Sequence, residues 1–206
     1  MSGDFASLAC NQLQWLPDVG VGFLDIERDD LYGEAYFENY RELDRTPMAK
    51  RLNDARLRLV ERHWKCTSQM VDIGIGGGSF MDAADCHGWD INPRAQHWLR
   101  EHERLIDPRV QRVRAATFWD SIEHIRDPSI ILANVERWAF VSTPTYASAN
   151  AARGSKHFKP GEHLWYFTER GIVRFMHEHG FRLRESNLME SDIGRDGIGS
   201  FAFERA

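Results

Sequence analysis

Apolar and polar positions recur with two different periods along the chain, and the change of period separates predicted helices from predicted strands. After Thr46-Pro47, apolar residues follow helical spacing, which predicts an amphipathic helix through about His63. Short apolar runs then predict four buried strands: MVDIG, GWDIN, RVRAATF and WAFVST. Helices are predicted between these strands, at 79–84, from Pro93 to about Arg104, and from Asp127 to about Arg137.

The last third of the chain continues the same alternation after one irregular stretch. Residues 145–165 have weak periodicity and are predicted to form a long loop. Thr168 is placed to cap a helix that runs to His179, and FRLRESN and GSFAFER are predicted to be the two final strands. Alternating strands and helices predict an α/β fold with a Rossmann-like sheet, mostly parallel with an antiparallel last strand.

The N-terminal part has a different character. Residues 1–45 are irregular and rich in aromatic side chains, and VGVGFLDI within them is predicted to form a strand or one arm of a hairpin. We therefore expect residues 1–45 to be an N-terminal appendage and residues 46–206 to be the main domain.

Composition narrows the class of protein. The chain has 206 residues with a net charge of −5, which suits one globular domain and gives no support to nucleic-acid binding through the whole surface. Arginines crowd residues 94–114, so a nucleic-acid partner stays open as a weaker alternative to a solvated helix face. No apolar run reaches the roughly 20 residues of a membrane span, and the N-terminus lacks the features of a signal peptide. With three scattered cysteines, these features favour a cytoplasmic protein without a membrane partner.

A glycine-rich loop follows the first strand of the main domain, where ligands bind in parallel α/β sheets. Gly74, Gly76 and Gly78 form GxGxG, with Asp72 before them and Asp90 at the predicted end of the second strand. A dinucleotide site requires GxGxxG, a phosphate loop requires a following GK[ST], and a mobile surface turn would leave the two acids unexplained. A carboxylate for an ammonium group and a carboxylate for ribose hydroxyls together indicate S-adenosylmethionine.

The order of the motifs resembles a known family. DIGIGGGSF, GWDINP, FWDSIEHI, WAFVSTP and HLWYFTERGIVRFMHEHGF are similar to class I S-adenosylmethionine-dependent methyltransferases over about residues 47–206, in particular to the ubiquinone-type O-methyltransferase branch and to short methyltransferase-like proteins of phages and bacteria. The resemblance implies that the glycine loop and Asp72 surround the methionine part of the cofactor and that Asp90 holds its ribose. The full set expected around the cofactor is Asp72, Gly74, Ile75, Gly76, Gly78, Asp90, Ile91, Phe118 and Trp119, with the last two as core or pocket wall.

One departure from the family concerns the edge of the sheet. Only 30 residues separate Asp90 from Asp120, which leaves room for one helix and one strand. The family usually has a further strand and helix there, and that region supplies part of the adenine pocket. We therefore expect a sheet with one shortened edge. The domain either catalyses methyl transfer or only binds the cofactor without catalysis.

A second group of polar residues follows the strand RVRAATF. WDSIEHI carries Asp120, Glu123 and His124, which are predicted to share one helical turn, and a later loop adds His163. Three interpretations apply: His124 is a general base oriented by a carboxylate, the four residues bind a divalent metal, or they are structural. The metal interpretation draws on a similarity of DxxEH…H to the ExxEH…H arrangement of small-RNA 2′-O-methyltransferases.

The function expected from these features is methyl transfer to an oxygen or nitrogen atom of a small or nucleotide-like acceptor, by a monomer or homodimer. The alternatives are a noncatalytic protein that binds S-adenosylmethionine on the same fold and, more distantly, a nicotinamide oxidoreductase.

Overall fold

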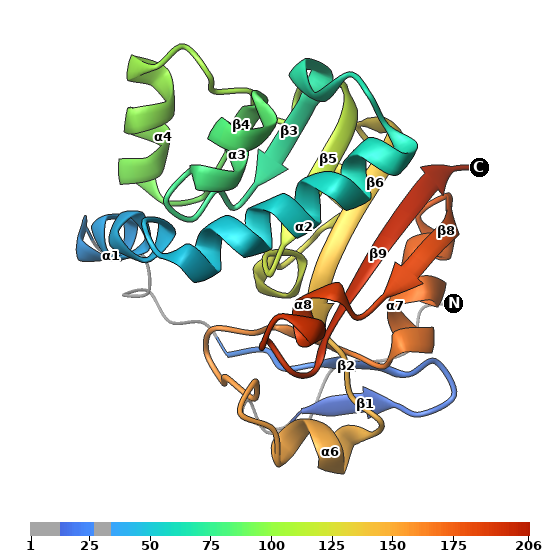
Figure 1. Cartoon of the computed structure of the whole chain (residues 1–206). Helices are drawn as coiled ribbons and strands as arrows, with labels where there is room; N and C mark the ends of the chain where they lie inside the picture. Colours follow the sequence, from blue (N-terminus) through green and yellow to red (C-terminus); the bar gives the residue numbers. More distant parts are fainter. Residues whose placement is uncertain (1–12, 27–33) are drawn as a thin grey trace.

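A six-stranded sheet forms the centre of the protein (Figure 1), whose computed structural model describes residues 13–26 and 34–206. The order of its strands is β4-β3-β5-β6-β9-β8, and only β9 runs antiparallel to its neighbours. This confirms the predicted mostly parallel sheet with an antiparallel last strand. The strands are β3 (Met70–Ile73), β4 (His87–Trp89), β5 (Val113–Trp119), β6 (Val135–Pro144), β8 (Phe181–Asn187) and β9 (Ile198–Arg205).

The edge at β4 is short, as predicted. Between β4 and β5 the chain forms only the helix α4 (Pro93–Glu101) and a loop, and a single bridge joins Gly88 of β4 to Leu105. That bridge is the only pairing in the described residues at the position where a further edge strand would lie. In the described residues, β4 is therefore the last strand at this edge of the sheet.

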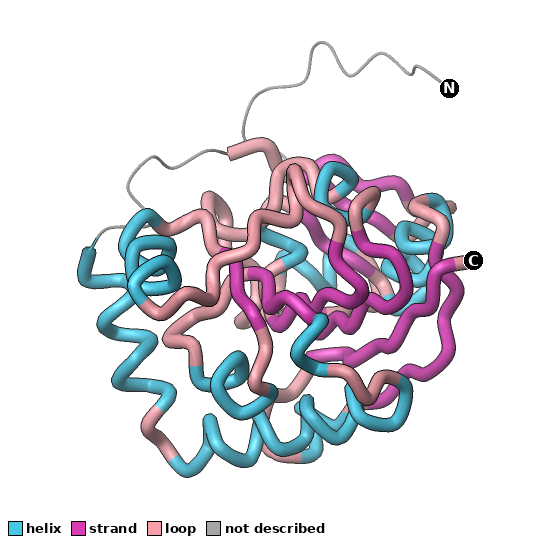
Figure 2. The backbone as a smooth tube through the Cα atoms, turned by 90° about the horizontal axis from the view of Figure 1, so that it is seen from above, coloured by secondary structure: helices cyan, strands magenta, loops and turns pink. Residues whose placement is uncertain are grey.

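Helices cover both faces of the sheet (Figure 2), because each strand sends alternate apolar side chains to opposite faces. On one face lie α2 (Pro47–His63), α3 (Ser79–Ala84) and α4, whose buried residues pack with Trp119. On the other face lie α5 (Ser129–Leu132) and α7 (Glu169–Glu178), which pack with Phe118. Thr46 caps α2 and Thr168 caps α7, as their sequences predicted.

Three predicted elements were wrong in their extent. The helix expected at 127–137 is only α5, because Val135 already pairs with Val113 and begins β6. The helix expected to reach Arg104 ends at Glu101, where Glu103 turns to a positive φ of 55°. The predicted loop 145–165 contains α6 (Ala149–Arg153), capped by Ser148, and runs into β7 (Trp165–Phe167).

The N-terminal part joins a second, smaller sheet. β1 (Gln14–Leu16) and β2 (Val21–Phe23) form a hairpin, and β2 pairs with β7 in the order β1-β2-β7. The predicted hairpin arm is confirmed. The helix α1 (Glu34–Asp44) was not predicted, and it lies beside α2, α3 and α4 (Figure 1). The division of the chain at residue 45 stays a prediction. The helix α8 (Met189–Asp192) completes the described elements.

Candidate functional site

A cavity of about 720 Å³ opens at the carboxyl ends of β3, β4 and β5. Asp72 and Asp90 both line it, from neighbouring strands, so the two acids share one cleft. The glycine loop after β3, residues of α1 and α2, and the loop 157–164 also line it. None of the helices in the described ranges is long and apolar enough to cross a membrane.

Asp72 is almost fully buried at the end of β3. Its carboxylate accepts a hydrogen bond of 2.6 Å from the hydroxyl of Thr117, on the adjacent strand β5. Burial raises the pKa of Asp72 to about 7, although Thr117 and the charge of Arg56 act in the opposite direction. A cationic ligand beside this carboxyl group would lower its pKa again and favour the ionised form.

Neighbouring side chains and backbone atoms lie so close to the glycine loop that some of its positions leave no room for a Cβ atom. Gly74 has a φ of 77°, and a Cβ there would lie 2.8 Å from the Cβ of Ser121. A Cβ on Gly77 would lie 2.7 Å from the backbone N and Cα of Arg41, so α1 rests directly on the loop. Gly74, Ile75 and Gly76 line the cavity, whereas Gly78 starts α3 with a φ of 92° and does not line it.

The N-terminus of α3 is occupied by the protein itself. The backbone N–H of Ser79 donates to the carboxylate of Asp44 at 3.0 Å, and the side-chain amide of Asn53 donates to the Ser79 hydroxyl at 2.8 Å. A pyrophosphate at this helix start would meet the negative charge of Asp44. The arrangement disfavours a dinucleotide.

Asp90 closes the second strand with its carboxylate held in place. It accepts the N–H of Asn92 at 2.8 Å, and burial raises its pKa to about 6. Ile91 beside it is 58% exposed and lines the cavity. Trp119 lines the cavity as well, but Phe118 faces the opposite side of β5 and lies in the core. The prediction that Phe118 contacts the cofactor is therefore wrong, because side chains alternate along the strand.

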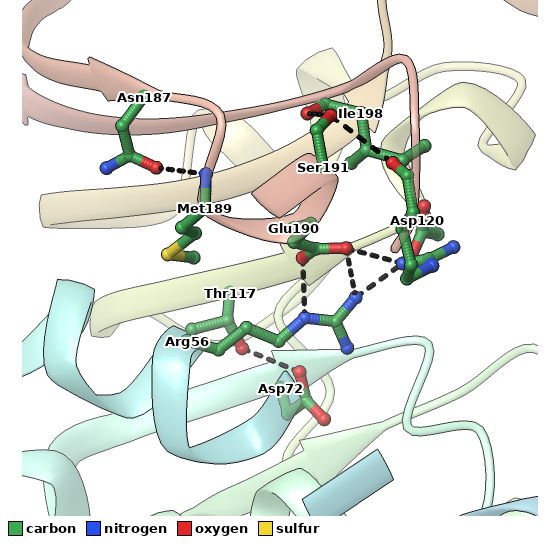
Figure 3. A network of polar contacts seen from close by, with 10 residues as sticks. Arg56, Asp72, Thr117, Asp120, Asn187, Met189, Glu190, Ser191 and Ile198 are labelled. Atoms are coloured by element: carbon green, nitrogen blue, oxygen red, sulfur yellow. Dashed lines mark hydrogen bonds and ion pairs between the residues drawn. The ribbon is translucent and has the colours of Figure 1, made fainter. Parts of the chain in front are cut away.

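A buried network of two arginines and two acids lies above Asp72 (Figure 3). Arg56 of α2 donates to Glu190 of α8 through Nε at 2.7 Å and Nη2 at 3.2 Å, and to Asp120 through Nη2 at 2.9 Å. Arg195 donates to Asp120 and Glu190 through Nη1. Burial alone would raise the pKa of Asp120, but the charges of Arg195 and Arg56 hold it below its usual range.

Asp120 therefore has a different role from the one expected. It has a φ of 51° and precedes the 3₁₀ turn η2 (Ile122–His124), so it does not share a helical turn with Glu123 and His124. Its carboxylate is directed at the two arginines. The expected four-residue set does not form.

Glu123, His124 and His163 do come together. One ligand atom from each lies within 4.8 Å of the others, and the two imidazole rings meet edge to face at 4.7 Å between centroids. The backbone explains the approach, because the N–H of Leu164 donates to the carbonyl of Glu123 at 2.8 Å and fixes the later loop on η2. All three residues line the cavity.

The three groups are uncharged at neutral pH. Burial, reinforced by the charge of Asp120, raises the pKa of Glu123 to about 8. Burial lowers the pKa of His163 to about 3 and also lowers that of His124. The carboxyl oxygens of Glu123 and Nδ1 of His163 are buried without a hydrogen-bond partner of ordinary geometry in the described part of the chain. These groups can exchange a proton with a ligand or coordinate a cation.

Sequence reasoning missed Arg56, Arg195, Glu190 and the residues of α1. Arg56 follows Leu52 and Asn53 on the side of α2 that lines the cavity, and this spacing was the one available signal. Arg195 and Glu190 stand in a polar C-terminal stretch without any pattern that predicts burial.

A family model described as "Methyltransferase domain" matches residues 40–186. No curated protein matches the chain.

Several solved structures have a similar fold at low identity. A magnesium protoporphyrin IX methyltransferase from Synechocystis PCC 6803 with bound SAH is 12% identical, with a TM-score of 0.58 over 86% of this chain and 97% of that one. A SAM-dependent methyltransferase from Aquifex aeolicus is 12% identical, with a TM-score of 0.60 over 82% and 98%. The 1,6-didemethyltoxoflavin-N1-methyltransferase of Burkholderia thailandensis is 11% identical, with a TM-score of 0.59 over 90% and 95%.

Proposed function

This chain belongs to the methyltransferase domain family, and we propose that it transfers a methyl group from S-adenosylmethionine to an oxygen or nitrogen atom of a small or nucleotide-like acceptor. One observation carries the cofactor assignment. Asp72 and Asp90 line a single cavity, with the close-packed glycine backbone between them. The similar folds cited above include proteins whose structures hold the demethylated cofactor.

The charges of the cavity match the amino-acid part of S-adenosylmethionine. Asp72 pairs with the ammonium group, and Asp90 accepts hydrogen bonds from the ribose hydroxyls. Arg56 complements Asp72, because Nη1 is the one nitrogen of its own guanidinium without a partner in the network and lies on the side of Asp72 in Figure 3. It is placed to bind the carboxylate of the cofactor. Ile91 offers an apolar surface for the adenine beside the shortened edge.

His124 takes the acceptor's proton. When bound, the cofactor supplies an electrophilic methyl group on a sulfonium centre. A lone pair of the acceptor forms the new bond to the methyl carbon as the carbon–sulfur bond breaks, and the acceptor's proton passes to His124. His124 is neutral before the reaction because burial lowers its pKa, and the negative charges of Glu162 and Asp120 stabilise the imidazolium that forms.

Substitution of His124 separates catalysis from binding. His124→Ala is expected to lower turnover at least about 100-fold, as for loss of a general base, while the affinity for S-adenosylmethionine stays unchanged. The matched control is His177→Ala, at an exposed position of α7. Turnover is measured as S-adenosylhomocysteine release with a panel of phenols, amines and nucleosides. Equal rates for both variants would refute the general-base role, and binding without turnover on any acceptor would favour the noncatalytic alternative.

A second candidate role for the same residues is a divalent metal site formed by Glu123, His124 and His163. The buried unpartnered atoms of Glu123 and His163 favour it, since mixed carboxylate and imidazole ligands suit zinc or manganese. Such an ion would lower the pKa of a bound acceptor hydroxyl, so that its proton could pass to solvent instead of to His124. Titration with Co²⁺, followed by its visible absorption, tests this role. Loss of the signal in His163→Ala but not in His177→Ala is expected, and no signal in the unsubstituted protein would exclude it.

A further inference from the structure

Arg195 lies at the acceptor end of the cavity. Along the sheet, Asp90 follows β4, Asp72 lies near the end of β3 and Asp120 follows β5, and these strands stand in the order β4-β3-β5. With the ribose at Asp90 and the amino acid at Asp72, the space beyond Asp72 is left for the acceptor. Arg195 pairs with Asp120 and lines the cavity, which places it in that space.

One edge of the Arg195 guanidinium is unused. Nη1 contacts both Asp120 and Glu190, whereas Nε and Nη2 make no hydrogen bond to any residue within 13–26 or 34–206. The side chain is 28% exposed and lines the cavity, and Nη1 is held by the two acids. An Nε–Nη2 edge fits the two oxygens of a carboxylate in a pair of parallel hydrogen bonds.

The surrounding loops fix the position of this edge. Nε2 of His157 contacts the carbonyl of Asp196 at 2.8 Å, which ties the turn that carries Arg195 to the loop 157–164. On the other side, a Cβ on Gly194 would lie 3.8 Å from the Cε of Met48, so the turn also packs on α2. Lys159 and Glu162, ion-paired at 3.0 Å, also line the cavity from the loop 157–164. These contacts within the protein therefore fix the position of Arg195 independently of any acceptor.

We propose that Arg195 determines specificity for an acceptor that bears a carboxylate, which it binds through the free Nε–Nη2 edge. This inference rests on the proposed methyl transfer, since it assigns the acceptor end from the cofactor's position. Its chemistry is charge-assisted recognition, with no bond made or broken at Arg195. The apolar residues Met48 and Leu52, which line the cavity from α2, would contact the body of the same molecule.

The test compares benzoate with the neutral benzamide, each titrated calorimetrically into the full chain saturated with S-adenosylhomocysteine. Benzoate is expected to bind about tenfold more tightly than benzamide, as for a charge-assisted pair of hydrogen bonds. Arg195→Lys keeps the charge beside Asp120 and Glu190 but removes the planar edge, and should reduce the preference for benzoate to about twofold or less. The control is Arg184→Gln, outside the cavity and ion-paired with Glu204.

The outcomes distinguish failure of this proposal from failure of the proposed function. Equal affinity for the two probes, including failure of both to bind, would overturn the proposal, as would an unchanged preference in Arg195→Lys. Failure of S-adenosylhomocysteine to bind would instead count against the proposed function, and the two probes can then be compared on the chain without it. Far-ultraviolet circular dichroism of each variant shows whether the fold is retained.

Discussion

The carboxylate of Glu190 is expected to be the most sensitive single charge in the protein. Its side chain is fully buried and contacts both Arg56 and Arg195, whose charges it balances together with Asp120. Glu190→Gln keeps the shape but leaves the buried Arg56 and the partly buried Arg195 with one carboxylate between them. Breaking a buried ion pair in this way costs about 3–5 kcal/mol. For a chain of this size, that loss corresponds to a fall of about 6–20 °C in the melting temperature.

Urea unfolding followed by circular dichroism measures this loss, with Glu178→Gln as the matched control. Glu178 also pairs with an arginine, Arg174 at 3.3 Å, but the two side chains are 59% and 47% exposed, so its removal should cost about 1 kcal/mol or less. Glu190→Gln should also weaken S-adenosylmethionine binding, because Arg56 loses the partner that orients it. The reasoning is refuted if the two variants lose the same stability, or if Glu190→Gln leaves cofactor affinity at its original value.

Three further predictions concern the glycine loop and the buried acids. The pKa of Asp72 is raised to about 7, so S-adenosylmethionine should bind more tightly as the pH rises through 7, and Asp72→Asn should remove this dependence in calorimetric titrations. Gly77→Ala places a methyl group against the backbone of Arg41, so it should displace α1 and destabilise the fold by about 1–3 kcal/mol, as measured in urea. The pKa of Glu123 rises from its ordinary 4.5 to about 8, so the folded state keeps a proton that the unfolded state has lost, and stability falls as the pH rises between these values. Glu123→Gln cannot ionise, and its melting temperature should therefore fall less over that range than that of the unsubstituted protein.

The parts of the fold that were predictable are those in which local sequence and tertiary contacts agree. The helix after Thr46 has a cap, a first-turn proline and a regular apolar stripe, and it forms as expected. The helix expected at 127–137 failed because strand pairing with β5 takes over from Val135. A local pattern carries no information on such a competition.

The same distinction separates the residues of the site. Asp72 and Asp90 could be named as candidates because each stands at a fixed distance from the glycine loop in the sequence, and both line the cavity. Arg56 and Glu190 are 134 positions apart, and each alone is indistinguishable from a solvated charge. Asp120 was placed with the wrong partners, since its positive φ turns it away from Glu123 and toward the arginines. Long-range ion pairs of this kind become visible only in three dimensions.

The central claim is that two acids from adjacent strands hold one molecule of S-adenosylmethionine, and calorimetric titration of the full chain with that ligand tests it most directly. We predict one binding site per chain and a loss of affinity of at least about tenfold in Asp90→Ala, as for lost hydrogen bonds to a charged group. Asp54→Ala, on the exposed side of α2, should bind like the unsubstituted protein. Absence of binding, or equal affinities of the Asp90 and Asp54 variants, would contradict the account.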